Sequence, residues 1–485
     1  MTDVLIVGAG TAGCVLAARL SEDPARRVTL VEAGPDFRGL DDLPDALRTG
    51  DGTGYDAGLR AVICDGRTDR LARGRVVGGS SQVNGCGALR ALPADLDAWA
   101  ARGFPDWSWA RVLDSYRRLE TDHDFPDAAH HGDHGPVPIV RPREADLSAP
   151  ARGFLDAVLD AGHPYRPDMN EPGATGIGPY PQNRRHGVRM SANLTHLAPA
   201  RARPNLTVRA GVRADRVLVR GGRAVGVEAA GETIPAGEVV LCAGVPMTPA
   251  LLLRSGIGPA AELRPLGITP VADLPGVGLH LYDQPGAVVP CAPAPGMEAT
   301  DAVLTQLIAR LAAIPGHPRD DAFYLNLFTG PDPYEGRPTS AIMVGDMSPR
   351  SRGTVTLTSA DPAVPPAVDL AFYTADGDLA RMRAAYRHAW SLTAHPSFAK
   401  TITGTPIDDA LVADDARLDA LLRAMTFSRG TLLGTAAMGP VVDAHCRVHG
   451  VAALRVVDLS IVPVPLRAPT AIDAMMLGEH AAQWF

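Results

Sequence analysis

The sequence predicts an α/β protein with more than one hydrophobic core, and three observations support this prediction. The chain has 485 residues, more than a single core usually organises. Its first 32 residues run from an apolar strand through a glycine-rich turn and a helical pattern to a second apolar strand. Hydrophobic residues make up 46% of the chain and charged residues 21%, as in folded globular proteins. We therefore expect two domains, or one large α/β domain with a second lobe.

The first turn has the pattern of a dinucleotide-binding site. An apolar strand over 4–7 precedes the turn, which consists of Gly8, Ala9, Gly10, Thr11, Ala12 and Gly13. In G-x-G-x-x-G the first glycine permits a tight turn, the second lets backbone approach a pyrophosphate, and the third packs helix on strand. The next strand ends in Glu32, which can bind ribose hydroxyls and would repel the 2′-phosphate of NADP. The alternative is an empty strand–helix turn of the same shape.

Charge and cysteine content narrow the classes of partner. The net charge of −8 argues against a nucleic-acid partner. No cysteine pair has C-x-x-C spacing and no Cys/His group has zinc spacing, so we expect reduced, mostly buried thiols and no metal. The early first strand leaves no room for a signal peptide, and no apolar run is long enough to span a membrane. We expect a cytoplasmic protein acting on a small molecule, with its oligomeric state open.

Three later blocks extend the pattern. RGRVVGGSSQVNGCGALR over 73–90 suits a loop lying along a cofactor, although alone it also fits a plain Gly/Ser turn. LCAGVPMTPALLLRSGIGP over 241–259 predicts a strand, a tight turn and a helix. LRVVDLSIVP over 454–463 predicts a short strand that runs into Asp458.

These blocks occur in the order found in the glucose–methanol–choline (GMC) oxidoreductases, and the sequence resembles that family over nearly its whole length. The resemblance also covers DLDAWAARGFPDWSW (95–109), HGDHGPVPI (131–139), LPGVGLHLYDQP (274–285) and SRGTVTLTSADP (351–362). It implies an FAD-dependent enzyme with a Rossmann-like FAD-binding domain of separated segments, 1–145, 200–285 and 430–485. A substrate-binding domain with an antiparallel sheet over the flavin ring would comprise 146–199 and 286–429.

The resemblance assigns cofactor contacts by position. The ADP half would contact Gly8, Gly10, Thr11, Ala12, Gly13 and Glu32, with Val212 by the adenine and Ala243 nearby. The pyrophosphate, ribityl chain and flavin would contact Arg73, Gly79, Ser80, Asn84, Gly85, Cys86 and Asp458. Some family members attach the flavin through a histidine just before this asparagine. That position is Val83 here, so we expect non-covalent FAD.

The catalytic positions depart from the family. The segment GTLLGTAAMG over 430–439 resembles the family segment His-x-x-Gly-Thr-x-x-Met-Gly, and the family's proton-accepting histidine falls on Thr431. The second polar residue, His or Asn in the family, falls on Pro469. A threonine hydroxyl is no base near neutral pH, and proline has no polar side-chain group. General-base catalysis contributes about 10²–10⁴ in rate, so the family's usual reaction is not expected to proceed in the usual way.

Other residues near these positions are candidates for the chemistry. Arg429 or Arg467 could bind a carboxylate, enolate or phenolate, although either could be a surface residue of an arginine-rich chain. Asp473 could be an alternative base or could complement the N-terminus of the last helix. That helix begins near Thr470, beside Pro469, and its N–H groups could face the flavin pyrimidine edge or could only pack. We expect His280 and Gln284 to line the domain junction, and neither His445 nor His449 to be catalytic.

Three functions remain open. The first is non-standard flavin chemistry on an organic, including an anionic, substrate: an oxidation needing no strong base, or a redox-neutral lyase, cyclase or isomerase step, as suits specialised biosynthesis. The second is ordinary alcohol oxidation, with hydride passing from CH–OH to flavin N5 and another base accepting the proton. The third is a flavin-binding scaffold without catalysis.

Overall fold

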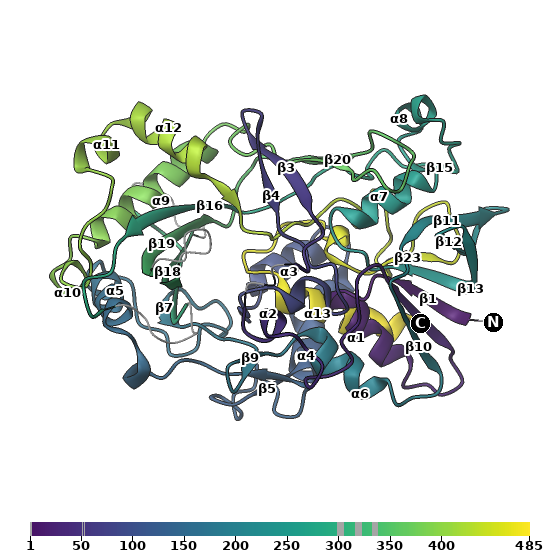
Figure 1. The fold of residues 1–485 in the computed structure, drawn as a ribbon, viewed down its shortest axis with the longest axis horizontal. Helices are drawn as coiled ribbons and strands as arrows, with labels where there is room; N and C mark the ends of the chain where they lie inside the picture. Colours follow the sequence, from purple (N-terminus) through teal and green to yellow (C-terminus); the bar gives the residue numbers. More distant parts are fainter. Residues whose placement is uncertain (1, 51, 53, 298–304, 316–322, 332–337) are drawn as a thin grey trace.

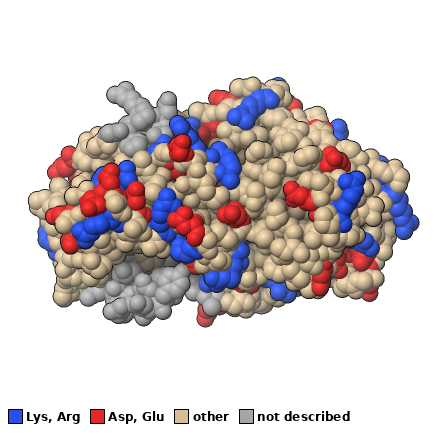
Figure 2. Space-filling model, turned by 90° about the horizontal axis from the view of Figure 1, so that it is seen from above, with Lys and Arg blue, Asp and Glu red and all other residues tan. Residues whose placement is uncertain are grey.

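The computed structural model describes residues 2–50, 52, 54–297, 305–315, 323–331 and 338–485. Two lobes lie side by side along the longest axis, and both chain ends lie in the same lobe (Figure 1). No helix in these ranges has both the length and the apolar character needed to cross a bilayer. On the face shown in Figure 2, acidic and basic side chains are interspersed, so this face carries no large field of one sign.

The lobe with the chain ends is built on a seven-stranded sheet. Its strands are β1 (Thr2–Val7), β2 (Val28–Glu32), β10 (Leu206–Ala210), β11 (Ala214–Arg220), β12 (Arg223–Ala229), β13 (Glu232–Leu241) and β23 (Leu454–Val456). The order is β10-β2-β1-β13-β12-β11, and β23 pairs with β13. β10, β2, β1, β13 and β23 are parallel, whereas β11 and β12 form an antiparallel extension. Near-continuous apolar runs in β1 and β2 fit a sheet buried on both faces.

The second lobe is built on a six-stranded antiparallel sheet, in the order β22-β16-β19-β18-β17-β7. Its strands are β7 (Gly176–Pro179), β16 (Pro285–Cys291), β17 (Leu307–Leu311), β18 (Phe323–Pro331), β19 (Pro338–Asp346) and β22 (Phe427–Ser428). Helices α5 (Ala149–Asp160) and α9 (Asp378–Leu392) share one apolar core with it, which includes Phe154, Leu325, Val344 and Tyr386. The residue ranges predicted for the two domains stay a prediction.

Four smaller sheets complete the strands of the described residues. One contains β20 (Thr354–Thr356), β21 (Ala367–Asp369), β3 (Leu59–Cys64) and β4 (Arg67–Leu71). Two-stranded pairs join β5 (Glu120–Asp122) with β6 (Val137–Ile139), β8 (Arg184–Arg185) with β9 (Val188–Arg189), and β14 (Ile257–Gly258) with β15 (Ala272–Asp273).

The helices are mostly short. They are α1 (Thr11–Leu20), α2 (Asp45–Arg48), α3 (Pro93–Ala100), α4 (Trp109–Leu119), α5 (Ala149–Asp160), α6 (Ala198–Ala200), α7 (Met247–Arg254), α8 (Ala260–Leu263), α9 (Asp378–Leu392), α10 (Pro396–Ala399), α11 (Asp409–Ala413), α12 (Asp415–Met425) and α13 (Ala471–Ala481). The last helix packs against the first at Gly478, where an added Cβ would lie 2.6 Å from the Ala12 carbonyl oxygen. Only glycine permits this close crossing of α13 on α1.

Candidate functional site

The glycine turn after β1 has the geometry that the sequence predicts. An added Cβ at Gly8, where φ is +104°, would lie 2.5 Å from the Cys242 carbonyl oxygen. One at Gly13 would lie 2.0 Å from the Gly8 carbonyl oxygen, so the helix packs directly on the strand end. At Gly10, by contrast, the nearest atom would be 3.7 Å away. The turn therefore needs glycine at 8 and 13 to close, and it leaves the backbone at Gly10 open for a close approach.

The N-terminus of α1 fits a phosphate-bearing cofactor. No side chain caps this ten-residue helix, and its first turn carries no acidic residue. Its first N–H groups are therefore left to an anion, which the helix dipole also favours. Glu32 ends β2 and accepts hydrogen bonds from the backbone N–H groups of Ala9 (3.0 Å) and Gly34 (2.8 Å). Burial raises the pKa of Glu32. These donors and this acid fit the ADP half of FAD.

The loop over 73–87 lies against the glycine turn. An added Cβ at Gly79, where φ is +52°, would lie 2.6 Å from the Cα of Gly10. Ser80 accepts from the Gly74 N–H at 3.3 Å, and the Asn84 side chain accepts from the Cys86 N–H at 3.1 Å. Gly85 has no atom within 4 Å of an added Cβ. The sequence-predicted cofactor loop and glycine turn are thus in contact in the fold.

Three further cofactor candidates lie at strand ends of the same sheet. The Val212 N–H donates to the Glu32 carbonyl at 2.8 Å, just beyond β10. Ala243 follows β13. Asp458 follows β23 and is buried; it accepts from Thr248 Oγ1 (2.5 Å), from the Gly244 N–H (2.9 Å) and from the Ser460 N–H (2.8 Å). Burial raises the pKa of Asp458. Its carboxylate fixes the turns on either side of it, and a direct cofactor contact stays a prediction.

Thr431 is buried and hydrogen-bonded to a carboxylate that the sequence analysis did not single out. Its hydroxyl donates to Asp283 Oδ1 at 2.7 Å, and its N–H donates to the same oxygen at 2.8 Å. The Ser428 hydroxyl donates to Asp283 Oδ2. The position that resembles the family's histidine therefore carries a neutral hydroxyl whose proton already has an acceptor.

Gln284 connects the two departing positions. Its backbone N–H lies 3.3 Å from Thr431 Oγ1, and its side-chain nitrogen donates to the carbonyls of Leu466 (3.0 Å) and Ala468 (3.1 Å). The second of these carbonyls directly precedes Pro469. Gln284 Oε1 is buried without a hydrogen-bond partner. The fold thus brings the segments of Thr431 and Pro469 together through one fully buried amide. Pro469 and Thr470 directly precede α13. The Thr470 side chain forms no hydrogen bond that caps this helix.

Arg429 lies between the six-stranded sheet and the cofactor loop. Its Nη1 would lie 1.8 Å from an added Cβ at Gly345, so the guanidinium rests directly on the sheet backbone. Its Cζ lies 5.7 Å from the centre of the Tyr324 ring. The charge of Arg429 also acts on Tyr180, whose hydroxyl packs against Gly87 of the cofactor loop. Burial lowers the pKa of Arg429, and its Nη1 is sealed from solvent without a hydrogen-bond acceptor.

The other two polar candidates have protein partners. Arg467 donates from Nε to Asp95 at 2.5 Å, and its N–H donates to the same carboxylate at 2.8 Å. Asp473 accepts from the Tyr116 hydroxyl at 2.5 Å and from the Ala91 N–H at 3.1 Å. Burial raises the pKa of Asp473 to about 6, and its Oδ2 has no partner. A substrate contact by Arg467 would have to break an ion pair, whereas Asp473 keeps one free oxygen.

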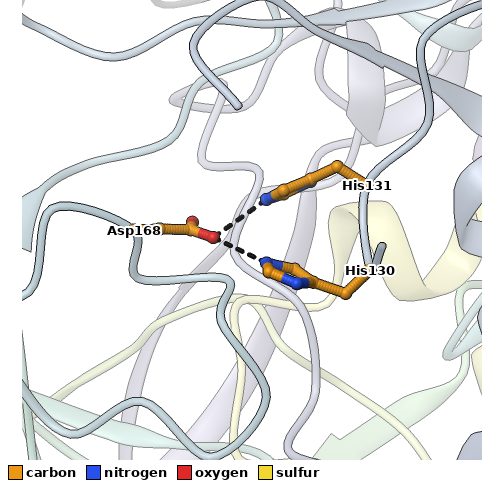
Figure 3. A group of neighbouring side chains, drawn as sticks. All are labelled: His130, His131 and Asp168. Carbon is orange, nitrogen blue, oxygen red and sulfur yellow. Dashed lines mark hydrogen bonds and ion pairs between the residues drawn. The ribbon is translucent and has the colours of Figure 1, made fainter. Parts of the chain in front are cut away.

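The motif over 131–139 contributes to a second polar group, which we call the His131 cluster: Arg90, Glu120, Asp122, His131, Arg141 and Asp168. Figure 3 shows the Nε2 atoms of His130 and His131 converging on Asp168 Oδ2, at 2.8 and 2.9 Å. Two histidines and a carboxylate at such distances could ligate a metal. However, Arg141 donates to Asp168 at 2.8 Å, and Arg90 donates to Glu120. Asp168 and Glu120 are thus already paired with guanidinium groups, whose positive charge would repel a cation at this place.

The remaining histidines named above lie elsewhere. His449 Nε2 lies 3.0 Å from the Gly439 carbonyl, and His445 lies near Asp106, at 3.8 Å. His280, where φ is +59°, lies in the loop that contacts Gly434. All six cysteines are buried and free of disulfide bonds.

Four residues that lie beside the candidate positions were not predicted from the sequence: Asp283, Arg310, Tyr180 and Tyr324. Asp283 directly precedes Gln284, which the sequence analysis named, but Asp283 itself was not predicted to lie at the site. Arg310 carried a usable signal, because it is a charged residue inside the apolar strand β17 and is only 2% exposed. The two tyrosines carried none, since only the pairing of distant strands brings them to Arg429.

Comparisons with known proteins agree with this architecture. Family models described as GMC oxidoreductase match residues 2–286 and 349–478. The chain is 36% identical to choline oxidase of Arthrobacter globiformis (99% of this chain, 93% of that one) and 35% identical to 5-(hydroxymethyl)furfural oxidase of Methylovorus sp. (99% and 98%). The crystal structure of pyridoxine 4-oxidase from Mesorbium loti superposes with a TM-score of 0.90 at 28% identity, covering 100% of this chain and 99% of that one.

The matches span both lobes, and they confirm the predicted resemblance and the predicted fold class. They also confirm the prediction of an oxidoreductase-type enzyme, and the members of this family bind FAD. On this evidence, the chain belongs to the GMC oxidoreductase family.

Proposed function

We propose that the chain is an FAD-dependent enzyme that transforms a small organic substrate, including an organic anion, without a histidine base. The observation that carries the proposal is the hydrogen bond from the Thr431 hydroxyl to Asp283 at 2.7 Å. A proton acceptor is needed where the substrate hydroxyl loses its proton. Here the side chain at that position is itself a donor to a neighbouring carboxylate.

FAD would supply a hydride acceptor, and the chain's own residues would bind and orient the substrate. Thr431 and Gln284 form one hydrogen-bonded wall, and Arg429 presents a positive charge beside it. Asp283 accepts two hydrogen bonds from Thr431 and one from Ser428, and these occupy three of the roughly four lone-pair sites of its carboxylate. The reactions that suit this arrangement need no strong protein base: oxidation of a group whose proton leaves to water, or a redox-neutral lyase, cyclase or isomerase step.

Ordinary alcohol oxidation is the second candidate, because Asp283 is a carboxylate adjacent to Thr431. The names of two relatives, a choline oxidase and a 5-(hydroxymethyl)furfural oxidase, favour it as well. Asp283 would then be the replacement base.

Anaerobic mixing of the FAD-loaded enzyme with primary alcohols separates the two candidates. We expect choline, methanol, glucose and benzyl alcohol to bleach the oxidised flavin band slowly. Bleaching at about 1–10³ s⁻¹, the usual range for enzymes, would establish the second candidate. In that case Asp283→Asn should abolish the reaction, and a retained rate would exclude Asp283 as the base.

We further propose that the FAD is held non-covalently. Val83 occupies the family's attachment position, offers no nucleophilic atom, and packs its Cγ1 against Gly52. Acid precipitation should release the yellow cofactor into the supernatant, and flavin that stays with the pellet would contradict the proposal.

A further inference from the structure

Two glycines in register support the Arg429 side chain. Gly345 on β19 pairs with Gly286 on β16 and with Tyr324 on β18. Directly paired residues in an antiparallel sheet place their side chains on the same face, so these positions form one row. An added Cβ would lie 1.8 Å from Arg429 Nη1 at Gly345 and 2.9 Å from Arg429 Cγ at Gly286. The missing side chains make the flat surface on which the guanidinium lies.

The same row contains a second arginine, Arg310, which is buried, whereas Arg429 is half-buried. Arg310 on β17 pairs with Tyr324, and its Cζ lies 5.6 Å from the centre of that ring. It donates to neutral acceptors: the Tyr324 hydroxyl (2.9 Å) and the carbonyls of Arg90 (2.8 Å) and Ala174 (3.5 Å). Arg310, Tyr324, Gly345 and Arg429 are called the Arg429 group below.

The Arg429 group carries positive charge without a carboxylate of its own. In the described part of the chain, neither Arg310 nor Arg429 forms an ion pair. Asp283 is an acid whose charge acts on Arg429, and its oxygens already accept from Thr431 and Ser428. Asp473 is the acid whose pKa the charge of Arg310 lowers, against the stronger opposite effect of burial. A buried charged donor without an acceptor is unfavourable, and an anionic ligand removes that cost.

A second donor is Tyr180, whose side chain belongs to the same buried cluster as Tyr324, the tyrosine whose ring Arg429 contacts. The Tyr180 hydroxyl lies against Gly87, 2.0 Å from the position of an added Cβ, and it has no hydrogen-bond partner among the described residues. Burial raises the pKa of Tyr180 to about 12, while the charge of Arg429 opposes that effect. The hydroxyl is therefore protonated at neutral pH and can donate.

We propose that Arg429 and Tyr180 bind a carboxylate of the substrate, with Gly286 and Gly345 holding the guanidinium in place. The inference rests on the proposed function for the reaction that follows, but not for binding itself. A guanidinium fork matches the two oxygens of a carboxylate, and the tyrosine hydroxyl supplies a further hydrogen bond. The substrate class is thus organic acids.

The test measures binding to the oxidised, FAD-loaded enzyme, so that it needs no turnover. Acetate, benzoate and octanoate are titrated at constant ionic strength while the flavin absorbance is followed, with acetamide, benzamide and octanamide as matched neutral probes. We expect at least one carboxylate to bind more tightly than its amide. Arg429→Met should weaken that carboxylate about 10- to 100-fold, as expected for the loss of charge-assisted hydrogen bonds, and leave its amide unchanged. Arg429→Lys should give an intermediate loss, because a lysine cannot form the fork.

Gly345→Ala provides an independent variant that keeps the charge but displaces the guanidinium, and we expect it to weaken the carboxylate as well. Arg352→Met is the matched control: this exposed arginine also lies over a tyrosine ring, 4.9 Å from the centre of Tyr282. The Arg352→Met variant should bind the carboxylate as tightly as the wild type does.

Three results would overturn the proposal: no carboxylate preferred over its amide, equal losses for both in Arg429→Met, or unchanged carboxylate binding in both Arg429→Met and Gly345→Ala. Sulfate and phosphate at the same ionic strength distinguish a carboxylate site from a general anion site, and equal competition by either would also count against it. The alcohol-bleaching experiment tests the proposed function separately, so the two can fail independently.

Discussion

The His131 cluster is buried and the Arg429 group is mostly buried, with Arg429 itself half-buried, and the two differ in how their charges are balanced. In the cluster, Arg141 donates to Asp122 and Asp168, both at 2.8 Å, and Arg90 donates to Glu120. In the Arg429 group, the guanidinium groups meet tyrosine rings, carbonyls and glycine backbone. Since burying an unpaired charge is costly, a protein that keeps one needs a reason beyond folding. Arginines that are paired with carboxylates, as in the His131 cluster, indicate a structural role, whereas unpaired arginines, as in the Arg429 group, indicate a site for an anionic ligand.

The largest expected effect comes from placing a titratable base beside the Arg429 group. Thr431→His with Pro469→Asn restores both of the family's polar positions, and Asp283 can accept one imidazole N–H and orient the ring. We expect alcohol oxidation to rise by up to about 10²–10⁴ and the native activity to fall, measured as anaerobic flavin bleaching. Misplacement by about 1 Å could reduce the gain 10²-fold. A double variant that keeps full native activity would place residue 431 outside the reacting site.

Removing an arginine from the balanced cluster should cost the most stability. Arg141→Met leaves Asp122 and Asp168 buried without their guanidinium partner, which we expect to lower the free energy of unfolding by about 3–5 kcal/mol. Urea unfolding of the FAD-loaded enzyme measures it. Arg143→Met, which removes an exposed arginine paired with Asp146, should cost less than about 1 kcal/mol. Equal losses in both variants would mean that the cluster does not act as a unit.

The pH dependence of stability should reflect His131. Burial alone would lower its pKa, but hydrogen bonds to Asp168 and Glu120 and the charge of Glu120 raise it overall, against the opposing charge of Arg90. A histidine whose pKa is raised in the folded state stabilises the folded protein at pH values below its unfolded-state pKa of about 6.5. This stabilisation is lost as the pH rises through the folded-state pKa. The effect is about 1.4 kcal/mol per unit of pKa difference. Unfolding measured between pH 6 and 9 should therefore show a fall that His131→Gln removes.

The acids of the cluster act in the opposite direction. The pKa values of Glu120, Asp122 and Asp168 are lowered by their partners, although burial alone would raise them. Their contribution is present above the unfolded values of about 4 and is lost as pH falls through the folded values. Because His131 is one of these partners and Arg90 and Arg141 are others, a His131→Gln variant should keep only part of this acid limb, and its complete loss would show that the arginines do not contribute to it.

The smallest expected effect is on the stability of Arg429→Met. Because this arginine has no carboxylate partner, its removal strands no opposite charge, and we expect a change within about 1 kcal/mol in either direction. The free energies of unfolding of Arg141→Met and Arg429→Met therefore compare the His131 cluster and the Arg429 group directly. A loss as large as that of Arg141→Met would show that Arg429 is structural.

Local patterns predicted much of the cofactor-binding half. The turn from Gly8 to Gly13, the acid at Glu32 and the helix after Thr470 follow from short-range rules of strand, turn and helix, and the structure has each of them. The site beside Thr431 was less accessible. Its hydrogen bond to Asp283 joins residues 148 apart, and Arg429 meets Gly345 only because the sheet is assembled from distant strands. No local propensity encodes such pairings.

The position of β13 between β1 and β23 has a consequence for biosynthesis. β1 pairs with a strand that ends at Leu241, and α1 is covered by α13, which follows it far along the chain. At about 5–20 residues per second, synthesis of the stretch from β1 to α13 takes roughly half a minute to a minute and a half. Throughout that time the apolar flank of α1 lacks α13. We therefore expect FAD to load only after α13 has been synthesised, and a nascent chain stalled before residue 470 to depend on chaperones.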